Sequence, residues 1–523
     1  MLKRVLTTML LLACLVMPVA ALADDAANDP SGVRTGGAAD VVGASANAPS
    51  ADDLKNLGPQ EPLALKLADV VGHNRIAINV VWTLVCGFLV MFMQAGFALA
   101  ETGFTRAKNA GHTMAMNFMV YGIGMLGYWI CGFALQMGGV GGVATLGGGG
   151  ALNGEFVINL FGRDFGLFGT KGFFLSGMTY DAIIFTVFLF QMVFMDTTAT
   201  IPTGSMAERW TFKSFVVYAF FISMFTYPLY ANWVWGGGWL SQLGKNFSLG
   251  HGTVDFAGSS VVHMTGGVAA LAGAIILGPR IGKYGKDGKP RAIPGHHIPM
   301  ALTGCFILAF GWFGFNAGSS LAGGDLRIGV VATNTMLASA AGAFFAMFYM
   351  WIFYGKPDIS MAANGLLAGL VAITAPCAFV NSVSAVIIGG IAGVILCLSV
   401  FFVERTLKVD DPVGAISVHG VNGAWGLLSL GLFADGTYGD GLNGVAGAVS
   451  GLFYGDASQF AAQIAGVITN LVFVFVVMYV FFKILDKIIP LRVQPEMEID
   501  GLDEHEVAVT AYPDFTIHKT SGL

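Results

Sequence analysis

Charged residues are scarce in this sequence of 523 residues. It contains 26 Lys and Arg and 32 Asp and Glu, or 11% of the chain, whereas a soluble globular chain carries roughly 25%. The sequence has no basic stripe, so nothing in it points to a nucleic-acid partner. The six cysteines lie in apolar stretches without CxxC spacing, which argues against a disulfide framework or a zinc site. No GxxxxGK[ST] motif is present, which argues against ATP-driven pumping. These absences exclude a large soluble enzyme, and they indicate no cofactor.

Apolar residues make up 55% of the sequence. They gather in runs long enough to cross a lipid bilayer, which takes about 20 residues per helix. The pattern predicts an all-α polytopic membrane protein with eleven transmembrane helices. The predicted spans are residues 77–100, 113–137, 180–204, 214–233, 257–277, 297–320, 328–354, 362–379, 383–403, 413–434 and 461–485.

The N-terminal residues have the form of a secretory signal peptide. Lys3 and Arg4 precede an apolar stretch, and Ala21-Leu22-Ala23 matches the small-x-small cleavage pattern. We therefore expect a signal peptide over residues 1–23 and a flexible periplasmic segment over residues 24–70. The membrane domain is expected over residues 71–490, and a cytoplasmic tail over residues 491–523.

The distribution of basic residues tests this orientation. From an N-terminus outside the cytoplasm, eleven crossings leave the C-terminus inside, and inner loops should then be rich in Lys and Arg. The predicted inner loops carry twelve basic residues: Arg106, Lys108, Arg209, Lys213, Arg280, Lys283, Lys286, Lys289, Arg291, Lys356, Arg405 and Lys408. The predicted outer loops carry four: Arg163, Lys171, Lys245 and Arg327. The asymmetry supports the predicted orientation.

Two stretches of the sequence match each other without a gap. Residues 255–267 and 411–423 share Asp, Gly, Val, His and Gly at equivalent positions. Five helices separate the two copies, and since five is odd, the copies must cross the membrane in opposite directions. The pattern predicts an inverted repeat of helices 1–5 and 6–10 followed by helix 11, with a site near the midplane between the halves.

Each copy of the repeat carries one histidine, His263 or His419, eight residues after its aspartate. Eight residues of helix span about 12 Å, so the two side chains should reach a similar depth from opposite faces. A lone histidine would be read as a hydrogen-bonded core residue. Two that are related by the repeat indicate a functional pair, which we expect to be neutral and able to pass a proton.

The acidic residues near the predicted helices allow several interpretations. Asp255 and Asp411 precede their helices and are expected to cap them; Asp255 is also expected to face the outer entrance and to attract a cation. Asp196 lies within the third helix, either in an interhelical hydrogen bond, for example to Asn117, or as a group that adjusts a proton path. Glu101 is interpreted as a solvated helix end.

Several motifs together resemble the ammonium transporter family (Amt/Mep/Rh), in particular its bacterial Amt members. The resemblance covers about residues 70 to 510 in the family's order. The motifs are Arg106-Ala-Lys108-Asn109, Phe190-Gln191-x-x-Phe194, Trp235-Gly-Gly-Gly238, Asp255-Phe-Ala-Gly258 with His263, Gly311-Trp-Phe-Gly-Phe-Asn-Ala-Gly-Ser319, and Asp410-Asp-Pro412 with His419-Gly420.

The resemblance implies a homotrimer in the bacterial inner membrane with one pore per subunit. It implies an outer recruitment site formed by Trp235 and Ser319, with Phe190 nearby and Asp255 in support. It also implies a gate formed by Phe194 and Phe315, and a pore lined by the twin histidines His263 and His419.

The expected function is ammonium transport, not enzyme catalysis. Trp235 can hold ammonium, or its analogue methylammonium, by a cation–π attraction of about 0.5–2 kcal/mol, and the Ser319 hydroxyl can accept one of its hydrogens. Loss of a proton would let ammonia pass an apolar pore, and the histidines could carry the proton separately. Potassium has no proton to give, which offers a basis for selectivity.

The acidic C-terminal tail is read from composition as a solvated segment. Gly501-Leu502-Asp503 with His505 resembles the family's tail motif, which implies packing on the cytoplasmic face and regulation by a PII-type signalling protein. Three other functions stay open: a haem-binding redox subunit held by the two histidines, an ammonium sensor that scarcely conducts, and passage of carbon dioxide.

Overall fold

The computed structural model describes residues 29–45, 47–139, 154–437, 445 and 447–514. Within these residues, ten helices are long and apolar enough to cross a membrane. A further apolar helix, α13 (Ile359–Ile373), is shorter and coincides with the predicted span 362–379. The chain is an all-α polytopic membrane protein, and the count of eleven crossings stays a prediction. The predicted signal peptide, residues 1–23, lies outside the described residues.

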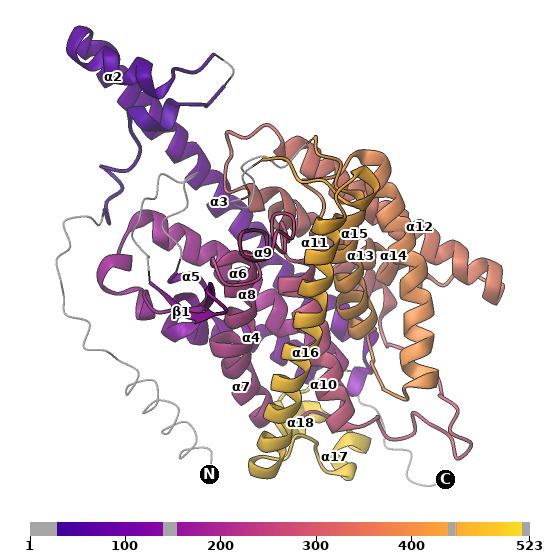
Figure 1. Ribbon diagram of the computed structural model, residues 1–523. Helices are drawn as coiled ribbons and strands as arrows, with labels where there is room; N and C mark the ends of the chain where they lie inside the picture. The colour runs from indigo at the N-terminus through magenta and orange to yellow at the C-terminus, as the bar shows by residue number, and fades with distance from the viewer. Residues whose placement is uncertain (1–28, 46, 140–153, 438–444, 446, 515–523) are drawn as a thin grey trace.

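The helices follow the predicted spans closely, and several spans continue through a 3₁₀- or π-helical turn (Figure 1). The first half contains α3 (Pro62–Phe104); η2 (Ala107–Asn109), α4 (Ala110–Gly127), η3 (Tyr128–Gly132) and α5 (Phe133–Met137); α6 (Ala182–Ser205); α7 (Phe212–Phe221), η7 (Ile222–Thr226) and α8 (Tyr227–Trp235); and η8 (Ser259–Met264) with α10 (Thr265–Leu277). The second half contains α11 (Ile298–Asn316) with η9 (Ala317–Ser320); α12 (Ile328–Tyr354); α13; α14 (Ser382–Phe401) with η10 (Phe402–Thr406); and η11 (Ile416–Val421) with α15 (Asn422–Phe433). The last long helix is α16 (Ala457–Ile488).

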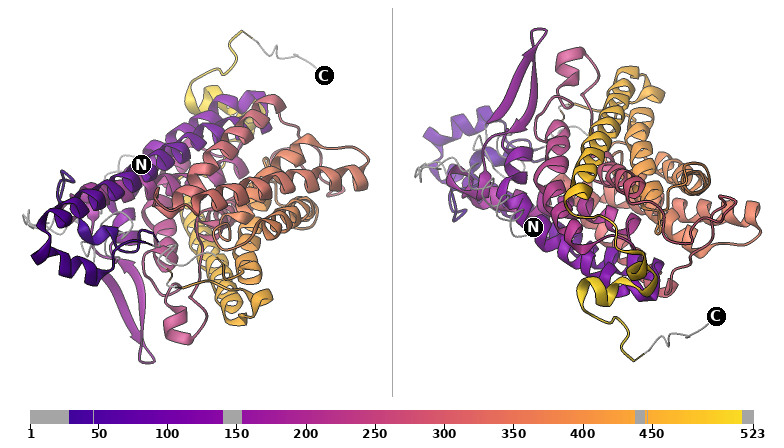
Figure 2. Two further views of the ribbon diagram at one scale, coloured as in Figure 1. Left: turned by 90° about the horizontal axis from the view of Figure 1, so that it is seen from above. Right: turned by 90° about the horizontal axis from the view of Figure 1, so that it is seen from below.

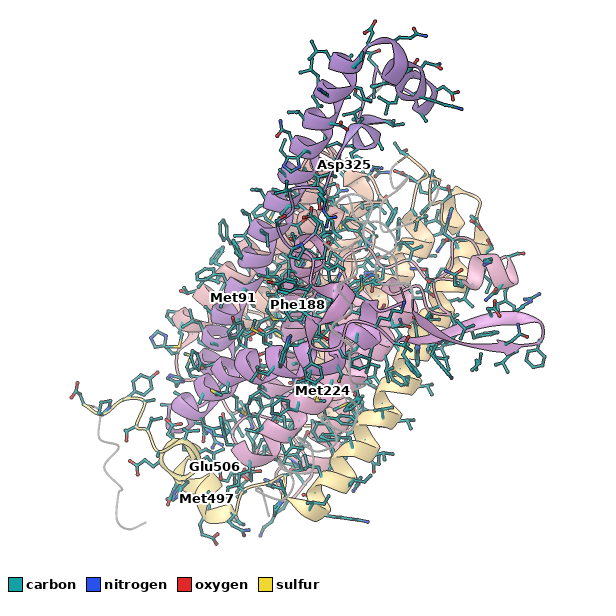
Figure 3. All side chains as sticks on the ribbon, turned by 90° about the vertical axis from the view of Figure 1, so that its left-hand side faces the viewer. Met91, Phe188, Met224, Asp325, Met497 and Glu506 are labelled. Atoms are coloured by element: carbon teal, nitrogen blue, oxygen red, sulfur yellow. The ribbon has the colours of Figure 1, made fainter. Side chains whose placement is uncertain are left out.

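The bundle has two distinct ends. We call the end that carries α17 (Pro495–Asp500) and α18 (Leu502–Val507) the tail end, and the end that carries β1 (Glu155–Leu160) and β2 (Arg163–Gly169) the hairpin end. Figure 3 shows Glu506 at the tail end and Asp325 at the opposite end, with mostly carbon-rich side chains between them. This distribution fits a protein whose middle contacts lipid.

The two copies of the repeat run in opposite directions. The first copy, η8 with α10, starts at the hairpin end beside Trp235 and ends at Leu277, whose carbonyl accepts a hydrogen bond from Arg492 next to the tail. The second copy, η11 with α15, starts at the tail end and runs to the beginning of α16 at the hairpin end. The predicted inverted repeat is therefore confirmed.

The first helices of the two halves, α3 and α11, pack against each other along glycines. A Cβ on Gly304 would lie 2.4 Å from the Ala100 nitrogen, and one on Gly103 would lie 2.5 Å from the Ala301 nitrogen. Helix packing in lipid depends on close van der Waals contact, which small residues permit. This seam brings the halves together along the long axis of the bundle.

Residues 29–70, which the sequence predicts to be flexible, contain regular structure. They include η1 (Ala38–Val41) and α2 (Ala51–Gln60), and α3 begins at Pro62 rather than at residue 77. Proline suits the first helical turn because its missing N–H has no partner there. The His73 Nδ1 atom lies 2.7 Å from the Thr35 carbonyl oxygen, which ties η1 to α3. In Figure 1, α2 and the start of α3 project beyond the bundle.

A β-hairpin interrupts the otherwise helical fold, within the long loop that the sequence left unassigned. Strands β1 and β2 are antiparallel, and they are joined at Phe161 and Gly162, which have φ values of +56° and +73°. Two successive positive φ angles match the right-handed twist of a two-residue hairpin turn. The Phe156 and Phe168 rings stack with centroids 4.9 Å apart, and the hairpin stands away from the bundle in both views of Figure 2.

Candidate functional site

The two histidines lie on helices that begin in the same way. In the first copy, Gly258 has a φ of +117° and precedes η8. In the second copy, Gly414 has a φ of +81° and lies two residues before η11. Glycine adopts positive φ without a steric cost. The Asp-x-x-Gly spacing therefore turns the chain into each helix at an equivalent point.

An aspartate caps each of these helices, as the sequence predicts. The Asp255 carboxylate accepts hydrogen bonds of 2.7–3.0 Å from the backbone N–H groups of residues 258 to 261. The Asp411 carboxylate accepts from the N–H groups of Ala415 at 3.1 Å and Ile416 at 2.7 Å. Both caps satisfy N–H groups that have no partner within the helix.

The repeat brings the two imidazoles into direct contact. The Nδ1 atoms of His263 and His419 are 3.2 Å apart, and their ring centroids are 5.3 Å apart at an interplanar angle of 24°. His263 is fully buried, and only 5% of His419 is exposed. One Nδ1 must donate while the other accepts, so the rings share a hydrogen bond along which a proton can move.

A continuous row of aromatic rings leads to the histidine pair from the hairpin end. The Trp235 ring centroid lies 6.2 Å from that of Phe194, and the Phe194 and Phe315 rings stack at 4.1 Å and 30°. Phe315 in turn stacks on His263 at 5.3 Å. We call these four rings together with His419 the ring column. The stacked phenyl pair closes the column between Trp235 and the histidines.

The hairpin end of the ring column combines a ring face with a hydroxyl. Trp235 Nε1 donates to the Asp255 carbonyl oxygen at 2.6 Å, which fixes the indole and leaves its π face as the group that attracts cations. Ser319 Oγ donates to the Phe315 carbonyl at 2.7 Å, so its oxygen remains an acceptor. The Phe190 ring lies 4.7 Å from that of Phe194. The predicted recruitment residues thus all lie near one end of the ring column.

The Asp255 carboxylate is turned into its own helix rather than exposed, and its predicted attraction for a cation stays a prediction. It is fully buried, and both carboxylate oxygens are engaged by the start of η8. The aspartate reaches the hairpin end of the ring column through its backbone carbonyl, which holds the Trp235 indole. The physical reason is that a cap must point back into its own helix.

Glu101 and Asp196 both differ from their predicted environments. Glu101 is 4% exposed and accepts hydrogen bonds on Oε2 from Asn117 Nδ2 and Thr203 Oγ1, both at 2.7 Å. Its interpretation as a solvated helix end is wrong, because α3 continues to Phe104 and α4 and α6 cover it. Asn117 therefore serves Glu101 and not Asp196. Among the described residues, Asp196 Oδ1 is buried and has no hydrogen-bond partner.

A small cavity lies beyond the histidine pair, toward the tail end. Its volume of about 30 Å³ is sufficient for one water-sized molecule. Glu101 and His419 both line this cavity. The other lining residues are Phe97, Ala100, Phe104, Ile201, Leu308, Asn364, Leu367, Val413, Ala415 and Val418. The ring column therefore leads into a mostly apolar space that is lined by one carboxyl group, one imidazole and the amide of Asn364.

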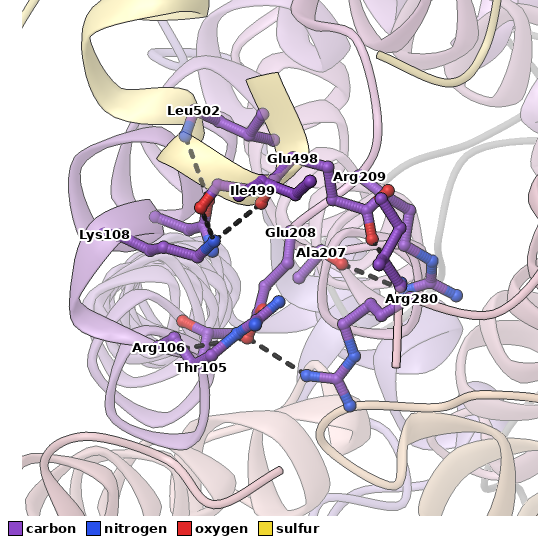
Figure 4. A network of polar contacts seen from close by, with 12 residues as sticks. Thr105, Arg106, Lys108, Ala207, Glu208, Arg209, Arg280, Glu498, Ile499 and Leu502 are labelled. Atoms are coloured by element: carbon purple, nitrogen blue, oxygen red, sulfur yellow. Dashed lines mark hydrogen bonds and ion pairs between the residues drawn. The ribbon is translucent and has the colours of Figure 1, made fainter. Parts of the chain in front are cut away.

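A buried ion network joins the two halves at the tail end (Figure 4). Glu208 pairs with Arg106 and, at 3.0 Å, with Arg280. Arg280 also pairs with Asp410 at 2.8 Å. Burial alone would raise the pKa of Asp410, but the charges of Arg209 and Arg280 outweigh it and hold that pKa well below its usual range. The sequence analysis assigned no role to this network.

The tail is packed against the bundle, as the resemblance implies. The Leu502 N–H donates to Asn109 Oδ1 at 3.0 Å. The Asp503 carboxylate accepts from the N–H groups of Gly111 at 3.0 Å and His112 at 2.8 Å, which caps α4. The tail thus holds the start of the span that also supplies Asn117. The reading of the tail as a solvated segment is wrong for these residues.

Trp312 is a site residue that the sequence analysis did not single out. Its ring stacks on His263 with centroids 5.0 Å apart at 20°, and its Nε1 donates to Thr374 Oγ1 at 2.9 Å. The spacing carried a signal, because Trp312 precedes Phe315 by three residues and so shares its helix face. His263 therefore lies against two aromatic rings of α11.

An inverted helical repeat in a membrane bundle is typical of transport proteins. The chain belongs to the Ammonium Transporter Family, whose family model matches residues 81–512.

Two curated relatives illustrate the match. The chain is 47% identical over 458 residues to ammonium transporter Amt2 of Archaeoglobus fulgidus, and the match covers 87% of this chain and 92% of the relative. It is 36% identical over 439 residues to an ammonium transporter of Bacillus subtilis, which covers 83% of this chain and 98% of the relative. These relatives are transport proteins and not enzymes.

Solved structures show the same fold. A protein described as a sensor Amt protein matches with a TM-score of 0.71 and 36% identity, over 83% of this chain and 99% of its own. Candida albicans Mep2 matches with a TM-score of 0.67 and 27% identity, over 80% of this chain and 87% of its own.

Proposed function

We propose that this protein takes up ammonium at the hairpin end, removes one proton and conducts ammonia along the ring column. The proposal rests above all on the 3.2 Å contact between His263 and His419 directly behind the stacked Phe194 and Phe315 rings. Twin imidazoles at this position give a neutral amine hydrogen-bonding partners inside an otherwise apolar path. They also give its proton a carrier.

Desolvation is the reason for removing the proton. Moving an unpaired cation through a path of phenyl rings costs several kcal/mol or more. Trp235 and Ser319 recruit the cation where water is still near. Phe194 and Phe315 then pass only the neutral amine when their rings part. The proton follows the histidine pair or remains outside, and this difference decides whether net transport carries charge.

Reconstitution in liposomes tests the proposal. Purified protein should take up ammonium and methylammonium and should not conduct potassium. The variant His263→Ala/His419→Ala should lose this selectivity or this uptake, because it removes both imidazoles. Uptake and current recorded on the same vesicles then separate ammonia from ammonia plus a proton. Equal passage of potassium and ammonium through the wild-type protein would refute the proposal.

Competing functions predict different results in the same experiments. A haem between the histidines requires its iron between two ring nitrogens, which would separate them by about 4 Å, whereas the Nδ1 atoms are 3.2 Å apart. A visible haem spectrum would nevertheless decide the matter. A sensor should bind methylammonium without uptake, and this alternative has support because one similar structure is described as a sensor Amt protein. A carbon dioxide channel should speed vesicle acidification without ammonium.

Asp196 is proposed to adjust the proton path beside the gate. It is 2% exposed and lies two residues after Phe194 on α6, where a charge would be costly and a protonated carboxyl would be stable. The variant Asp196→Asn keeps the shape of the side chain and removes its proton. We expect it to change the pH profile of transport, and an unchanged profile would remove Asp196 from the mechanism.

We further propose that the protein is a homotrimer in the bacterial inner membrane, with its N-terminus outside. Large apolar side chains on the outer surfaces of α3, α12 and α16 are exposed in the single chain, and they suit contact with lipid or with a second subunit. Native mass spectrometry should give three subunits. Protease accessibility in oriented vesicles should place the tail inside.

A PII-type signalling protein is proposed to bind at the tail end and to close the path there. The tail residues Asp503 and His505 line a large surface cavity together with Lys108, His296 and Tyr512. Such a surface is wide enough to receive a loop of a partner. Pull-down of PII by the full chain and by a chain that ends at residue 490 tests the proposal, because equal binding would exclude the tail.

A further inference from the structure

The buried carboxyl of Glu101 has no role in the function proposed above, which assigns the proton to the two histidines alone. It lines the same small cavity as His419. Its Oε2 atom is fixed by Asn117 and Thr203, both at 2.7 Å. A buried acid in a membrane bundle is costly, and where it lines a cavity it marks a proton or ion path.

The hydrogen bonds of Glu101 form an organised network behind the cavity. Thr200 Oγ1 donates to Asn117 Oδ1 at 2.9 Å, which turns the Asn117 amide so that its Nδ2 points at Glu101. Gln94 Nε2 donates to the Thr200 hydroxyl at 2.9 Å and to the Asn117 carbonyl at 2.6 Å. This network draws on α3, α4 and α6, and it positions one carboxyl beside a mostly apolar cavity that is also lined by His419 and Asn364.

We propose that Glu101 is the proton acceptor at the inner end of the histidine relay. The inference rests on the proposed function, and it assigns a role to a residue at the same site. Because His419 Nδ1 faces His263, Nε2 is the atom through which His419 passes a proton onward. The order of the side chains is then His263, His419 and Glu101, from the gate toward the tail end.

The proton transfer conserves atoms and charge at each step. A proton binds His419 Nδ1 from the His263 side, and the proton on His419 Nε2 leaves, directly or through one water in the cavity. It binds the Glu101 carboxylate to form the acid, and His419 is again neutral with its proton on Nδ1. The Glu101 O–H bond then breaks as the proton passes to water at the tail end. Return of His419 to its first tautomer completes the cycle.

Other titratable groups face Glu101 and belong to the same environment. Asp411, which caps η11, lies close enough to interact with it electrostatically, and so does Tyr218 on α7. The Gly204 N–H also donates to the carboxylate. If Glu101 had a structural role alone, it would need only to accept hydrogen bonds from Asn117 and Thr203, and the side-chain oxygen of a glutamine can accept both. The test therefore compares the acid with its amide.

The decisive measurement is the charge moved per methylammonium taken up, recorded on the same liposomes. We expect Glu101→Gln to lower this ratio at least fivefold, because the amide oxygen can still accept from Asn117 and Thr203 whereas the amide cannot carry the proton. The ratio for Glu101→Asp should lie between those of Glu101→Gln and the wild type, with a larger solvent deuterium isotope effect on the current. The control Glu496→Gln makes the same change at an exposed tail residue and should leave the ratio unchanged.

The possible outcomes separate this inference from the proposed function. A wild-type ratio in Glu101→Gln overturns the inference and leaves ammonium transport intact. So does a wild-type protein that takes up methylammonium without any charge. Absence of uptake by the wild type overturns the proposed function itself. If Glu101→Gln fails to fold, Glu101→Asp decides alone, since an acceptor role requires its current to fall more than its uptake.

Discussion

The two copies of the repeat have the same local structure and different surroundings. Each begins with a capping aspartate, a glycine of positive φ and a π-helical turn that carries a histidine. His263 lies against two aromatic rings of α11, those of Trp312 and Phe315. His419 lies beside a small cavity that it shares with Glu101.

Under the proposed function, this difference would let one sequence motif serve two purposes. In the first copy, the rings beside His263 would exclude water and leave a path for the neutral amine only. In the second copy, the cavity and its carboxyl would give the proton a way out. The start of the second copy is also tied into the ion network of Glu208, Arg280 and Asp410, whereas the start of the first is held by backbone N–H groups on Asp255. Five predictions test this contrast, from the largest expected effect to the smallest.

Removal of Asp410 should destabilise the second copy most strongly. Taking one partner from a buried ion pair costs roughly 3–5 kcal/mol of folding free energy. We expect about 3 kcal/mol for Asp410→Ala, because Arg280 would still form its ion pair with Glu208. Thermal unfolding in detergent measures the loss. Asp287→Ala breaks the exposed pair with Lys289 and serves as a control with little effect.

The same carboxyl predicts how stability depends on pH. Its pKa is lowered in the folded protein, so its contribution is complete above the usual carboxyl pKa and is lost as the pH falls through the lowered value. The difference in unfolding temperature between wild type and Asp410→Ala should therefore persist down to about pH 4. A difference that vanished near neutral pH would contradict the ion network.

Single replacements of the histidines should have unequal effects on transport. His263→Ala removes the ring that links the gate to the relay, and we expect methylammonium uptake to fall about a hundredfold, or about 2.7 kcal/mol of barrier. Uptake by the His419→Ala variant should fall less, because the cavity beside this position can admit water in place of the ring. Uptake in liposomes measures both. An equal loss in the two variants would remove the proposed asymmetry.

The two glycines of positive φ should differ in their tolerance of a side chain. A Cβ on Gly258 would lie 2.7 Å from Val262 and 3.1 Å from Trp235, while one on Gly414 would lie 3.2 Å from the Asn364 amide. A positive φ costs alanine about 1–2 kcal/mol at either position. Gly258→Ala should in addition weaken ammonium recruitment through Trp235, which a higher KM for uptake would reveal. Equal KM values would count against this link.

The smallest effect is expected where α11 meets α13. Thr374→Val removes the acceptor for Trp312 Nε1, and the unpaired indole should cost about 1 kcal/mol. Because Trp312 stacks on His263, uptake should fall two- to fivefold with little change in fold. Thr374→Ser retains the acceptor and should behave as the wild type in the same assay.

Much of the fold could be predicted because lipid imposes simple rules. The span boundaries followed from apolar length, and the opposite directions of the two copies followed from an odd number of helices between them. The resemblance also named residues that the structure brings together, among them Phe194 and Phe315. The hairpin and the helical residues 29–70 escaped prediction, because short polar segments outside the bilayer carry no comparable constraint.

The acidic side chains show most clearly where the sequence was insufficient. Glu101 was assigned to solvent and Asp255 to the entrance, yet both are buried. A carboxyl near a helix end has the same sequence pattern whether water or another helix covers it. Only the packing of α3, α4 and α6 distinguishes the two.

The sequence by itself determined where the apolar segments lie, that the two copies of the repeat run in opposite directions and that one histidine recurs in each half, because these depend on composition and order along the chain. Tertiary structure decided that the two rings touch, that Trp312 backs one of them and that Glu101 shares a cavity with the other. Such contacts depend on side chains from helices far apart in sequence, whose distances are set only when the halves pack.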